Sequence, residues 1–295
     1  MASSPVRSQA RLELLAFVAL CLAWGGAFYW IKVALVQLPP FTLVGWRLLV
    51  GGLLLALHAL IVRPQWPRGW AQWWPLLLMG LINMAVPWVM TTSGQQYIDT
   101  GVASIMLSTM PLFTVILAYF TLKEDRLRGW QWLGLLVGFA GVVLLLLRDV
   151  GASQSTLWGY VSHLLAAFLY AASAVFARKA LHPHSVLVQA LVPTLFSGAL
   201  VWLLVPLVER PVQAPTQWLP LLGVLYLGVF SSYLAYLLYY YLIRTIGPAR
   251  VSLTTYTFPL VGVVMGVLFL GETLDPALLL GGGLVLGSVF IVNRA

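Results

Sequence analysis

"STMPLFTVILAYFTLKE" (residues 108–124) and "YTFPLVGVVMGVLFLGE" (residues 256–272) are two copies of one pattern. Each copy contains Thr-x-Pro-Leu, and in each a glutamate follows the proline by thirteen positions. The residues between proline and glutamate are almost all apolar, which predicts a long apolar helix with a proline near its middle. Because the pattern occurs twice, 148 residues apart, we expect a chain built from two related halves.

The composition of the chain indicates a membrane protein. Hydrophobic residues make up 61% of the sequence and charged residues 8%, and the mean hydropathy is +0.94. A soluble domain could not cover so much apolar surface with polar groups. Apolar runs of about 20 residues suit helices that cross roughly 30 Å of hydrocarbon, so we predict an all-α integral membrane protein. Its ten expected spans are 12–34, 41–62, 71–93, 98–121, 129–148, 156–179, 184–207, 217–243, 249–270 and 274–293.

Lysine and arginine are distributed unequally between the two sides of these spans. Loops that face the cytoplasm carry the excess of basic residues. Twelve basic residues lie on the side of the N-terminus, and only Lys32, Arg148 and Arg210 lie on the other. We therefore predict cytoplasmic N- and C-termini. The net charge of +8 follows from this topology, and we expect no nucleic-acid partner.

Superposing the two prolines brings other residues into register. The pairs at this offset are Ser104 with Ser252, Thr109 with Thr257, Pro111 with Pro259, and Glu124 with Glu272. Earlier in each half, "LAWGGAFYWIKVAL" (22–35) resembles "FLYAASAVFARKAL" (168–181) at an offset of 146. We predict two halves, 1–150 and 151–295, with five spans each.

An odd number of spans per half requires that the second half enters the membrane from the opposite side. The charges agree, because Glu124 lies in the basic cytoplasmic segment and Glu272 in the outer segment "GETLD". The predicted fold is therefore ten transmembrane helices in two inverted five-helix repeats around a central cavity. Inverted repeats are typical of secondary transporters, whose sites lie near the midplane between the repeats.

Three segments carry a resemblance to a known family. "GVASIMLSTMPLFTVILAYFTLKE" (101–124), "PARVSLTTYTFPLVGVVMGVLFLGE" (248–272) and "FTLVGWRLLVGGLLLAL" (41–57) resemble the EamA-type members of the drug/metabolite transporter superfamily. The resemblance covers nearly the whole chain and implies transport of a small solute by alternating access. The many aromatic residues look most like the YddG-type exporters of aromatic amino acids. That likeness implies a bacterial cytoplasmic (inner) membrane and an amino acid or related metabolite as the solute.

The two prolines are candidate hinges. Pro111 and Pro259 each lack an N–H and clash with the carbonyl four residues back, which bends a helix. Because the prolines are duplicated at equivalent positions, we predict one hinge for each gate of the pathway. The alternative is a packing kink, since proline is common in membrane helices.

Polar and aromatic residues at helical spacing are the candidates for the substrate site. Trp24, Tyr170, Tyr233 and Tyr236 are too deep for an interfacial aromatic belt. A cavity with rings, a few hydroxyls and one imidazole would suit a flat, amphipathic solute. The predicted binding residues are Trp24, Asn83, Ser104, Ser108, His163, Tyr170, Tyr233, Tyr236, Ser252 and Tyr256. The alternatives are that the rings and serines only pack helices, and that His163 is neutral and bonded to a carbonyl.

Arg47 is one of two ionisable side chains, with His163, placed deep in a predicted span. It resembles the family's recurrent basic residue at this point. Two structural roles are possible for it. The guanidinium could donate hydrogen bonds to backbone carbonyls, or the side chain could extend toward the membrane interface. We assign it as a structural basic residue.

Other groups of the sequence bear on partners and cofactors. The only cysteine, Cys21, lies inside the first span, so we predict no disulfide, no metal site and no cofactor. The fifth and tenth spans contain Gly134-x-x-x-Gly138 and Gly283-x-x-x-Gly287, which favour close helix contact. These two spans are candidates for a homodimer contact. Small solutes and the lipid bilayer are the other expected partners.

The energy source and three competing functions can be compared on the same residues. All eight acidic residues lie at or near span ends, and the sequence lacks a nucleotide-binding P-loop, so we predict facilitated or exchange transport. His163 offers the one route to proton coupling.

A phosphorylated or nucleotide-linked solute should need several deep cations. An intramembrane enzyme should need a nucleophile with a base or a metal cluster, and we predict no enzyme. A channel would conduct without alternating access.

Overall fold

The protein is described by a computed structural model over residues 5–122, 129–148, 154–181, 184–247 and 251–292. Within these ranges the ordered elements are all helical. Nine described helices are long and apolar enough to cross a membrane, and the tenth, Pro276–Ile291, is apolar but shorter. The predicted all-helical, ten-span architecture is confirmed. The chain is a multi-pass membrane protein.

Several spans consist of more than one helix. The first half contains α1 (Pro5–Gly25) with α2 (Ala27–Ala34), α3 (Pro40–Val62), α4 (Trp70–Gly80) with η1 (Leu81–Ala85) and α5 (Val86–Gly94), α6 (Thr100–Leu107) with α7 (Met110–Leu122), and α8 (Gly129–Arg148). The second half contains α9 (Gln154–Ala180), α10 (Val186–Val208), α11 (Trp218–Gly228) with η2 (Val229–Leu234) and α12 (Ala235–Thr245), η3 (Ser252–Tyr256) with α14 (Thr257–Leu270), and α15 (Pro276–Val292). The predicted boundary at residue 150 lies outside the described residues.

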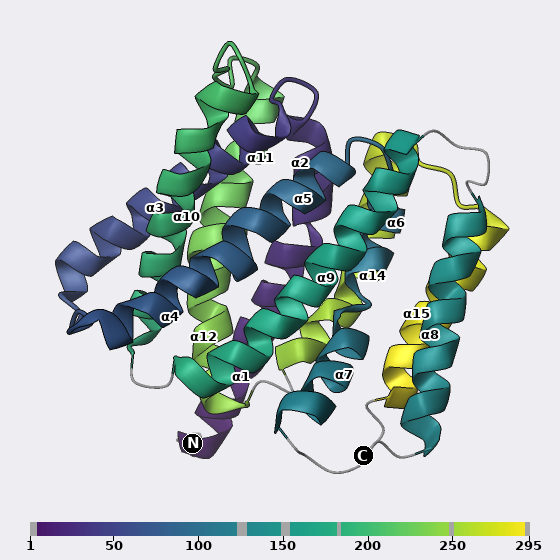
Figure 1. The fold of residues 1–295 in the computed structure, drawn as a ribbon, viewed down its shortest axis with the longest axis horizontal. Coiled ribbons are helices and arrows are strands. Elements are labelled where there is room, and N and C mark those ends of the chain that lie inside the picture. Colours follow the sequence, from purple (N-terminus) through teal and green to yellow (C-terminus); the bar gives the residue numbers. More distant parts are fainter. Residues whose placement is uncertain (1–4, 123–128, 149–153, 182–183, 248–250, 293–295) are drawn as a thin grey trace.

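The helices pack in a pattern that repeats between the halves. Equivalent spans pack against each other: α3 with α10, α6 of the fourth span with α14 of the ninth, and α8 with α15. Contacts between non-equivalent helices also occur in matched pairs: α5 packs on α9 as α12 packs on α1, and α7 packs on α9 as α14 packs on α1. Figure 1 shows α1 rising from the lower edge and α9 descending toward it, with both chain ends low in the view. The two repeats are therefore inverted.

The fourth and ninth spans are both interrupted just before their prolines. In the first half α6 ends at Leu107 and α7 begins at Met110, one residue before Pro111. The Ser108 and Thr109 hydroxyls donate to the Ile105 and Met106 carbonyls, both at 2.7 Å. These bonds supply partners for carbonyls at the break, where the α-helical pattern stops.

The second half uses the same kind of interruption. The 3₁₀-helix η3 precedes α14, which contains Pro259 as its third residue. Thr254 and Thr257 donate side-chain bonds of 2.8 and 2.7 Å to carbonyls three residues earlier. Both predicted bends are thus present as broken helices. A hinge function for them stays a prediction.

The third and eighth spans each contain a π-helix at the same place. The π-helix η1 begins at Leu81 and η2 begins at Val229, 148 residues later. A π-helix bonds residue i to residue i+5, so side chains five apart come to the same face. This change of register decides which residues of these spans meet the centre of the molecule.

The helices α8 and α15 lie beside each other at the edge of the bundle (Figure 1). Gly141 and Gly281 permit their close approach, since a Cβ on Gly141 would lie 2.7 Å from the Gly281 carbonyl oxygen. Gly138 faces Leu112 and Ser288 within the same chain. A Cβ on Gly283 or Gly287 would meet nothing within 4 Å among the described residues. The homodimer contact stays a prediction, with Gly283 and Gly287 as its open face.

Candidate functional site

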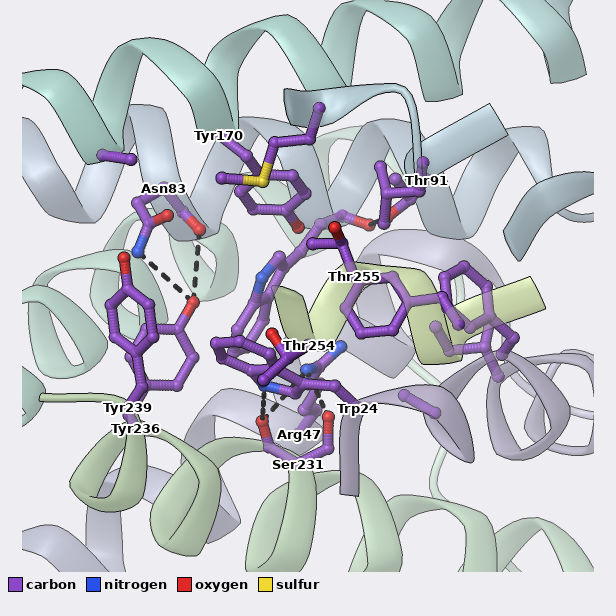
Figure 2. Close-up of a pocket in the computed structure, with 18 of the residues that line it drawn as sticks. Trp24, Arg47, Asn83, Thr91, Tyr170, Ser231, Tyr236, Tyr239, Thr254 and Thr255 are labelled. Carbon is purple, nitrogen blue, oxygen red and sulfur yellow. Dashed lines mark hydrogen bonds between the residues drawn. The ribbon is translucent and has the colours of Figure 1, made fainter. Parts of the chain in front are cut away.

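A cavity of about 130 Å³ lies between the two halves. This is far more than the roughly 10–15 Å³ that a single water needs. Its described walls come from the first, second, third, fourth, sixth, eighth and ninth spans, with no residue from α8 or α15. Figure 2 shows Asn83 with Tyr236 toward one end of the cavity, and Tyr170 across from Arg47 and Ser231.

Most of the cavity wall consists of equivalent residues from the two halves. These pairs are separated by 146 residues in the first and sixth spans and by 148 elsewhere. They are Trp24 with Tyr170, Phe28 with Ala174, Asn83 with Ser231, Trp88 with Tyr236, Thr91 with Tyr239, Leu107 with Thr255, and Met110 with Phe258. The cavity therefore lies where the pseudo-symmetry of the fold places a midplane site.

Aromatic rings form one side of the cavity. Trp24 contacts the rings of Tyr236, Tyr239 and Phe258, with centroids 5.8, 5.3 and 6.4 Å apart. These spacings lie in the range of favourable edge-to-face and tilted pairs. The Trp24 Nε1 donates to the Ser231 carbonyl at 3.3 Å, so its indole is held in one orientation. The rings are a preformed apolar surface for a flat solute.

Arg47 carries the positive charge of the cavity wall. Its Nε donates to Ser232 Oγ at 3.0 Å, and its Nη2 donates to Ser231 Oγ at 2.9 Å. Its guanidinium carbon lies 3.6 Å from the centroid of the Trp88 ring. Both serines belong to η2, whose wide turn places two consecutive hydroxyl groups toward α3.

Asn83 lies on η1 and is satisfied by its neighbours. Its Nδ2 donates to the Tyr236 hydroxyl at 3.3 Å, and its Oδ1 accepts from Ser173 at 2.9 Å (Figure 2 shows the first of these contacts). The side chain thus joins three spans at the cavity wall. Its polar atoms are oriented by protein groups before any solute arrives.

Four of the predicted binding residues line the cavity. These are Trp24, Asn83, Tyr170 and Tyr236, and Arg47, predicted as structural, lines it too. Ser104 and Ser108 are fully buried and donate to the carbonyls of Gly101 and Ile105, each at 2.7 Å. Ser104 lies at the contact of α6 with α14, where a Cβ on Gly262 would meet it at 2.5 Å.

Three further predicted residues, His163, Tyr233 and Tyr256, do not belong to the described cavity wall. His163 Nδ1 donates to the Gly159 carbonyl at 2.8 Å, and the residue is fully buried. The hydroxyl of Tyr233 pairs with His58 at 3.2 Å. The hydroxyl of Tyr256 donates to the Val289 carbonyl at 3.2 Å. Ser252 begins η3, and its side chain lies outside the described residues.

Other lining residues were not among the predicted binding residues, and the polar and aromatic ones among them are Phe28, Trp88, Thr91, Gln95, Ser231, Tyr239, Thr254, Thr255 and Phe258. Trp88 follows Asn83 by five positions, and Tyr236 follows Ser231 by five. A search at helical spacings of three and four cannot pair such residues, because it assumes an unbroken α-helix. The spacing of five, present at equivalent points in both halves, would have connected Trp88 to Asn83 and Ser231 to Tyr236.

Two polar contacts lie at the end of the cavity where α2 and α5 end and α6 begins, and the second of them joins the halves. This end is called the outer end here, after the predicted topology. Lys32 Nζ donates to the Gln95 and Ile98 carbonyls, both at 2.9 Å. Glu272 accepts from the backbone N–H groups of Thr100 and Gly101, at 2.6 and 3.0 Å. A carboxylate at a helix N-terminus is favourable, so Glu272 fastens the second half to the start of α6. Its counterpart Glu124 lies outside the described residues.

Comparison with known proteins places this architecture in a family. The sequence pattern of the EamA-like transporter family matches residues 11–147 and 157–294, which together make up most of the chain. The chain belongs to the EamA-like transporter family. This EamA-like chain is therefore a membrane transporter, and the resemblance found in its sequence is confirmed.

Relatives of this EamA-like transporter carry names that agree. It is 28% identical to "Uncharacterized inner membrane transporter YedA" of Escherichia coli (strain K12), over 94% of this chain and 89% of that protein. It is 29% identical to "Uncharacterized transporter YvbV" of Bacillus subtilis (strain 168), over 95% and 90%. It is 28% identical to "Protein PecM" of Dickeya dadantii (strain 3937), over 96% and 92%. The first two names indicate transporters rather than enzymes.

A crystal structure of another protein has the same fold as this EamA-like transporter. The two superpose with a TM-score of 0.68, covering 96% of this chain and 97% of the other. Because the two sequences are 20% identical, the likeness supports the fold and carries no assignment of substrate.

Proposed function

We propose that this protein is a secondary carrier of aromatic amino acids and related small amphipathic solutes, working by alternating access in a bacterial inner membrane. The observation that carries the proposal is the composition of the cavity wall, in which equivalent residues of two inverted halves surround one central space. A carrier with inverted repeats can expose such a site to either side by exchanging the conformations of its halves.

The shape and chemistry of the wall support an aromatic solute. Trp24, Tyr236 and Tyr239 form a continuous ring surface, and Phe28 packs on Phe258 with centroids 5.7 Å apart. Threonine hydroxyls and amide groups interrupt this surface at a few points. A mostly apolar pocket with a small number of fixed polar groups suits a ring that carries polar substituents.

The closed outer end supports alternating access. Opening of that end requires Lys32 to leave two carbonyls and Glu272 to leave the start of α6. Each contact joins segments that lie on different spans, so these contacts stabilise a state closed on that side. The broken spans at Pro111 and Pro259 are the segments whose backbone bonds can be rearranged at the lowest cost.

Two other functions have less support. A phosphorylated solute would need several cations, and Arg47 is the single basic side chain among the described lining residues. An intramembrane enzyme would need a reactive pair at the cavity. Of the described candidates, His163 bonds to Gly159 and Ser104 bonds to Gly101, and neither lines the cavity.

Counterflow in liposomes tests the proposal. Purified protein is reconstituted with unlabelled tryptophan inside, and uptake of labelled tryptophan is measured. We expect saturable uptake stimulated by internal solute, and we expect Trp24→Ala to lower it at least about tenfold because the stacking surface is lost. Trp218→Ala is the matched control, since this tryptophan is 71% exposed on the outside of the bundle and should retain full uptake.

The same liposomes separate the alternatives. Uptake unaffected by imposed proton and sodium gradients is expected, because no acidic residue occurs among the described lining residues. Flux that neither saturates nor responds to internal solute would indicate a channel. Equal loss of uptake in Trp24→Ala and Trp218→Ala, or no tryptophan flux at all, would contradict the proposed carrier of aromatic solutes.

A further inference from the structure

The described side chains that line the central cavity carry a positive charge and no negative charge. Among the described lining residues Arg47 is the single cation, and none is an aspartate or glutamate. At the equivalent point of the second half, both Pro193, 146 residues later, and Leu195, 148 residues later, are uncharged, so the pseudo-symmetry of the wall is broken here. A charge in a membrane span without a partner is costly, roughly 2.5–3.5 kcal/mol at a helix centre. An anionic group brought by a solute would offset this cost.

The hydrogen bonds of Arg47 leave part of its guanidinium available. Its Nε donates to the Ser232 hydroxyl. Its Nη2 donates to the Ser231 hydroxyl and, at 3.5 Å, to the Ser231 carbonyl. Nη1 has no hydrogen-bond partner in the part of the chain that the structure describes, although Arg47 is a wall residue of the cavity. An arginine that only tied helices together would be expected to use both terminal nitrogens in that role.

The orientation of the guanidinium is fixed before a solute binds. The Trp88 ring covers one face at 3.6 Å, and the two serine contacts hold one edge. The remaining edge, with Nη1, is therefore presented in a defined plane. A fixed, charged N–H group in a pocket sheltered from water is a strong donor to a carboxylate oxygen.

We propose that Arg47, through Nη1, binds the carboxylate group of the transported solute. The carrier then accepts solutes with one carboxylate, including zwitterionic amino acids, and discriminates against amines that lack one. A monocarboxylate fits one donor edge, whereas a phosphate dianion would need further cations. This inference rests on the proposed function, since it assigns the anchoring group in the same cavity. Trp88, Ser231 and Ser232 act as positioning residues for Arg47.

Three indole compounds that differ only in their charged groups test the inference. Tryptophan, indole-3-propionate and tryptamine carry the same ring with both groups, the carboxylate alone, or the amine alone. Their affinities for the purified protein are measured by isothermal titration. We expect the two carboxylates to bind at least about tenfold more tightly than tryptamine, because a charge-assisted hydrogen bond is lost with the amine.

Arg47→Gln should remove the preference by bringing the three affinities within about threefold of one another. Arg68→Gln is the matched control, because it removes one positive charge at an exposed site far from the cavity wall and should keep the preference. If Arg47→Gln does not yield folded protein, the double variant Ser231→Ala with Ser232→Ala keeps the charge and removes its hydroxyl contacts. It should reduce the preference several-fold.

The outcomes separate this inference from the proposed function. Tryptamine binding as tightly as tryptophan, or a preference that persists in folded Arg47→Gln, overturns the role of Arg47, whatever tryptophan flux is found. Leucine and isopentylamine form a second pair without a ring. One outcome would support the carboxylate anchor and refute the aromatic solute. In it, the protein binds leucine in preference to isopentylamine, Arg47→Gln loses this preference, and no indole compound binds. Failure of every carboxylate to bind also overturns the inference.

Discussion

Among single residues of the cavity wall, Arg47 and Trp88 form a close cation–π contact. The guanidinium lies 3.6 Å from the ring centroid, and both side chains are buried. A cation over a tryptophan face is worth about 2 kcal/mol or more when water is excluded. Trp88 therefore stabilises a buried charge in addition to filling space between α3 and α5.

Substitution of Trp88 should measurably lower stability. We expect Trp88→Leu to cost roughly 2–4 kcal/mol, from the lost ring contact and the void that remains. Trp88→Phe keeps a smaller ring face and should cost about half as much. The apparent melting temperature in detergent measures both. Trp70→Leu is the control, since Trp70 is 71% exposed and should change little. Equal melting temperatures for the Leu and Phe variants would refute a stabilising role for the ring face.

Sequence reasoning at this scale was limited by where side chains point. The depth of the rings in their spans predicted Trp24, Tyr170 and Tyr236, which line the cavity. It also predicted Tyr233, whose hydroxyl pairs with His58 instead. His163 fits the same reasoning, but its imidazole is turned toward the Gly159 carbonyl of its own helix. No pattern in the sequence shows whether the imidazole points toward the cavity or toward a carbonyl of its own helix. The unused edge of Arg47 depends on Ser231 and Ser232, about 185 residues away, and likewise needs coordinates.

At the scale of helices, α8 and α15 pack through glycine. A Cβ on Gly141 would lie 2.7 Å from the backbone oxygen of Gly281, and backbone cannot give way as a flexible side chain can. Gly141→Ala should therefore push the two helices apart. Over-packing of this kind costs typically about 1–3 kcal/mol.

A matched pair of glycine variants measures this contact. Gly141→Ala should lower the apparent melting temperature by several degrees, whereas Gly283→Ala should leave it unchanged, because Gly283 has no described neighbour within 4 Å of its added Cβ. Tryptophan counterflow per folded molecule should survive in both, since neither helix supplies a described cavity residue. A larger loss from Gly283→Ala than from Gly141→Ala would show that the face of Gly283 is covered, as in a dimer.

Helix interruptions were predictable to different degrees. The breaks before Pro111 and Pro259 follow from proline chemistry and could be located from the repeated pattern. The π-helices η1 and η2 contain no proline and have no comparable marker in the sequence. Their effect is to bring Asn83 with Trp88, and Ser231 with Tyr236, to one wall. The sequence therefore predicted the spans well, but it predicted only some of the residues that face the cavity.

The contact between Glu272 and the start of α6 holds the outer end of the protein closed. Glu272 accepts two backbone N–H groups at the start of α6, and these bonds must break for that end to open. Glu272→Gln removes the charge and leaves one acceptor oxygen. The closed state should lose about 1–2 kcal/mol, which corresponds to a five- to thirtyfold shift toward the open state.

Thiol labelling in membranes measures this shift. Cys21, the only cysteine, is replaced by serine, and Thr91 on the cavity wall is replaced by cysteine. Labelling by a membrane-impermeant maleimide from the outside should be several-fold faster with Glu272→Gln. Glu13→Gln, a carboxylate change within α1 whose side chain bonds Gln9 of the same helix, should not alter the rate. An unchanged rate in Glu272→Gln would mean that this contact does not control outer access.

The matched positions of η1 and η2 also bear on the history of the chain. A π-turn contains one residue more than an α-turn, so each marks the place of a single inserted residue. Both insertions occur at the same point of their halves, 148 residues apart. One insertion in an ancestral five-helix gene, followed by its doubling, accounts for both. On this account the change of helical register at the pocket was already present in the unit that was doubled.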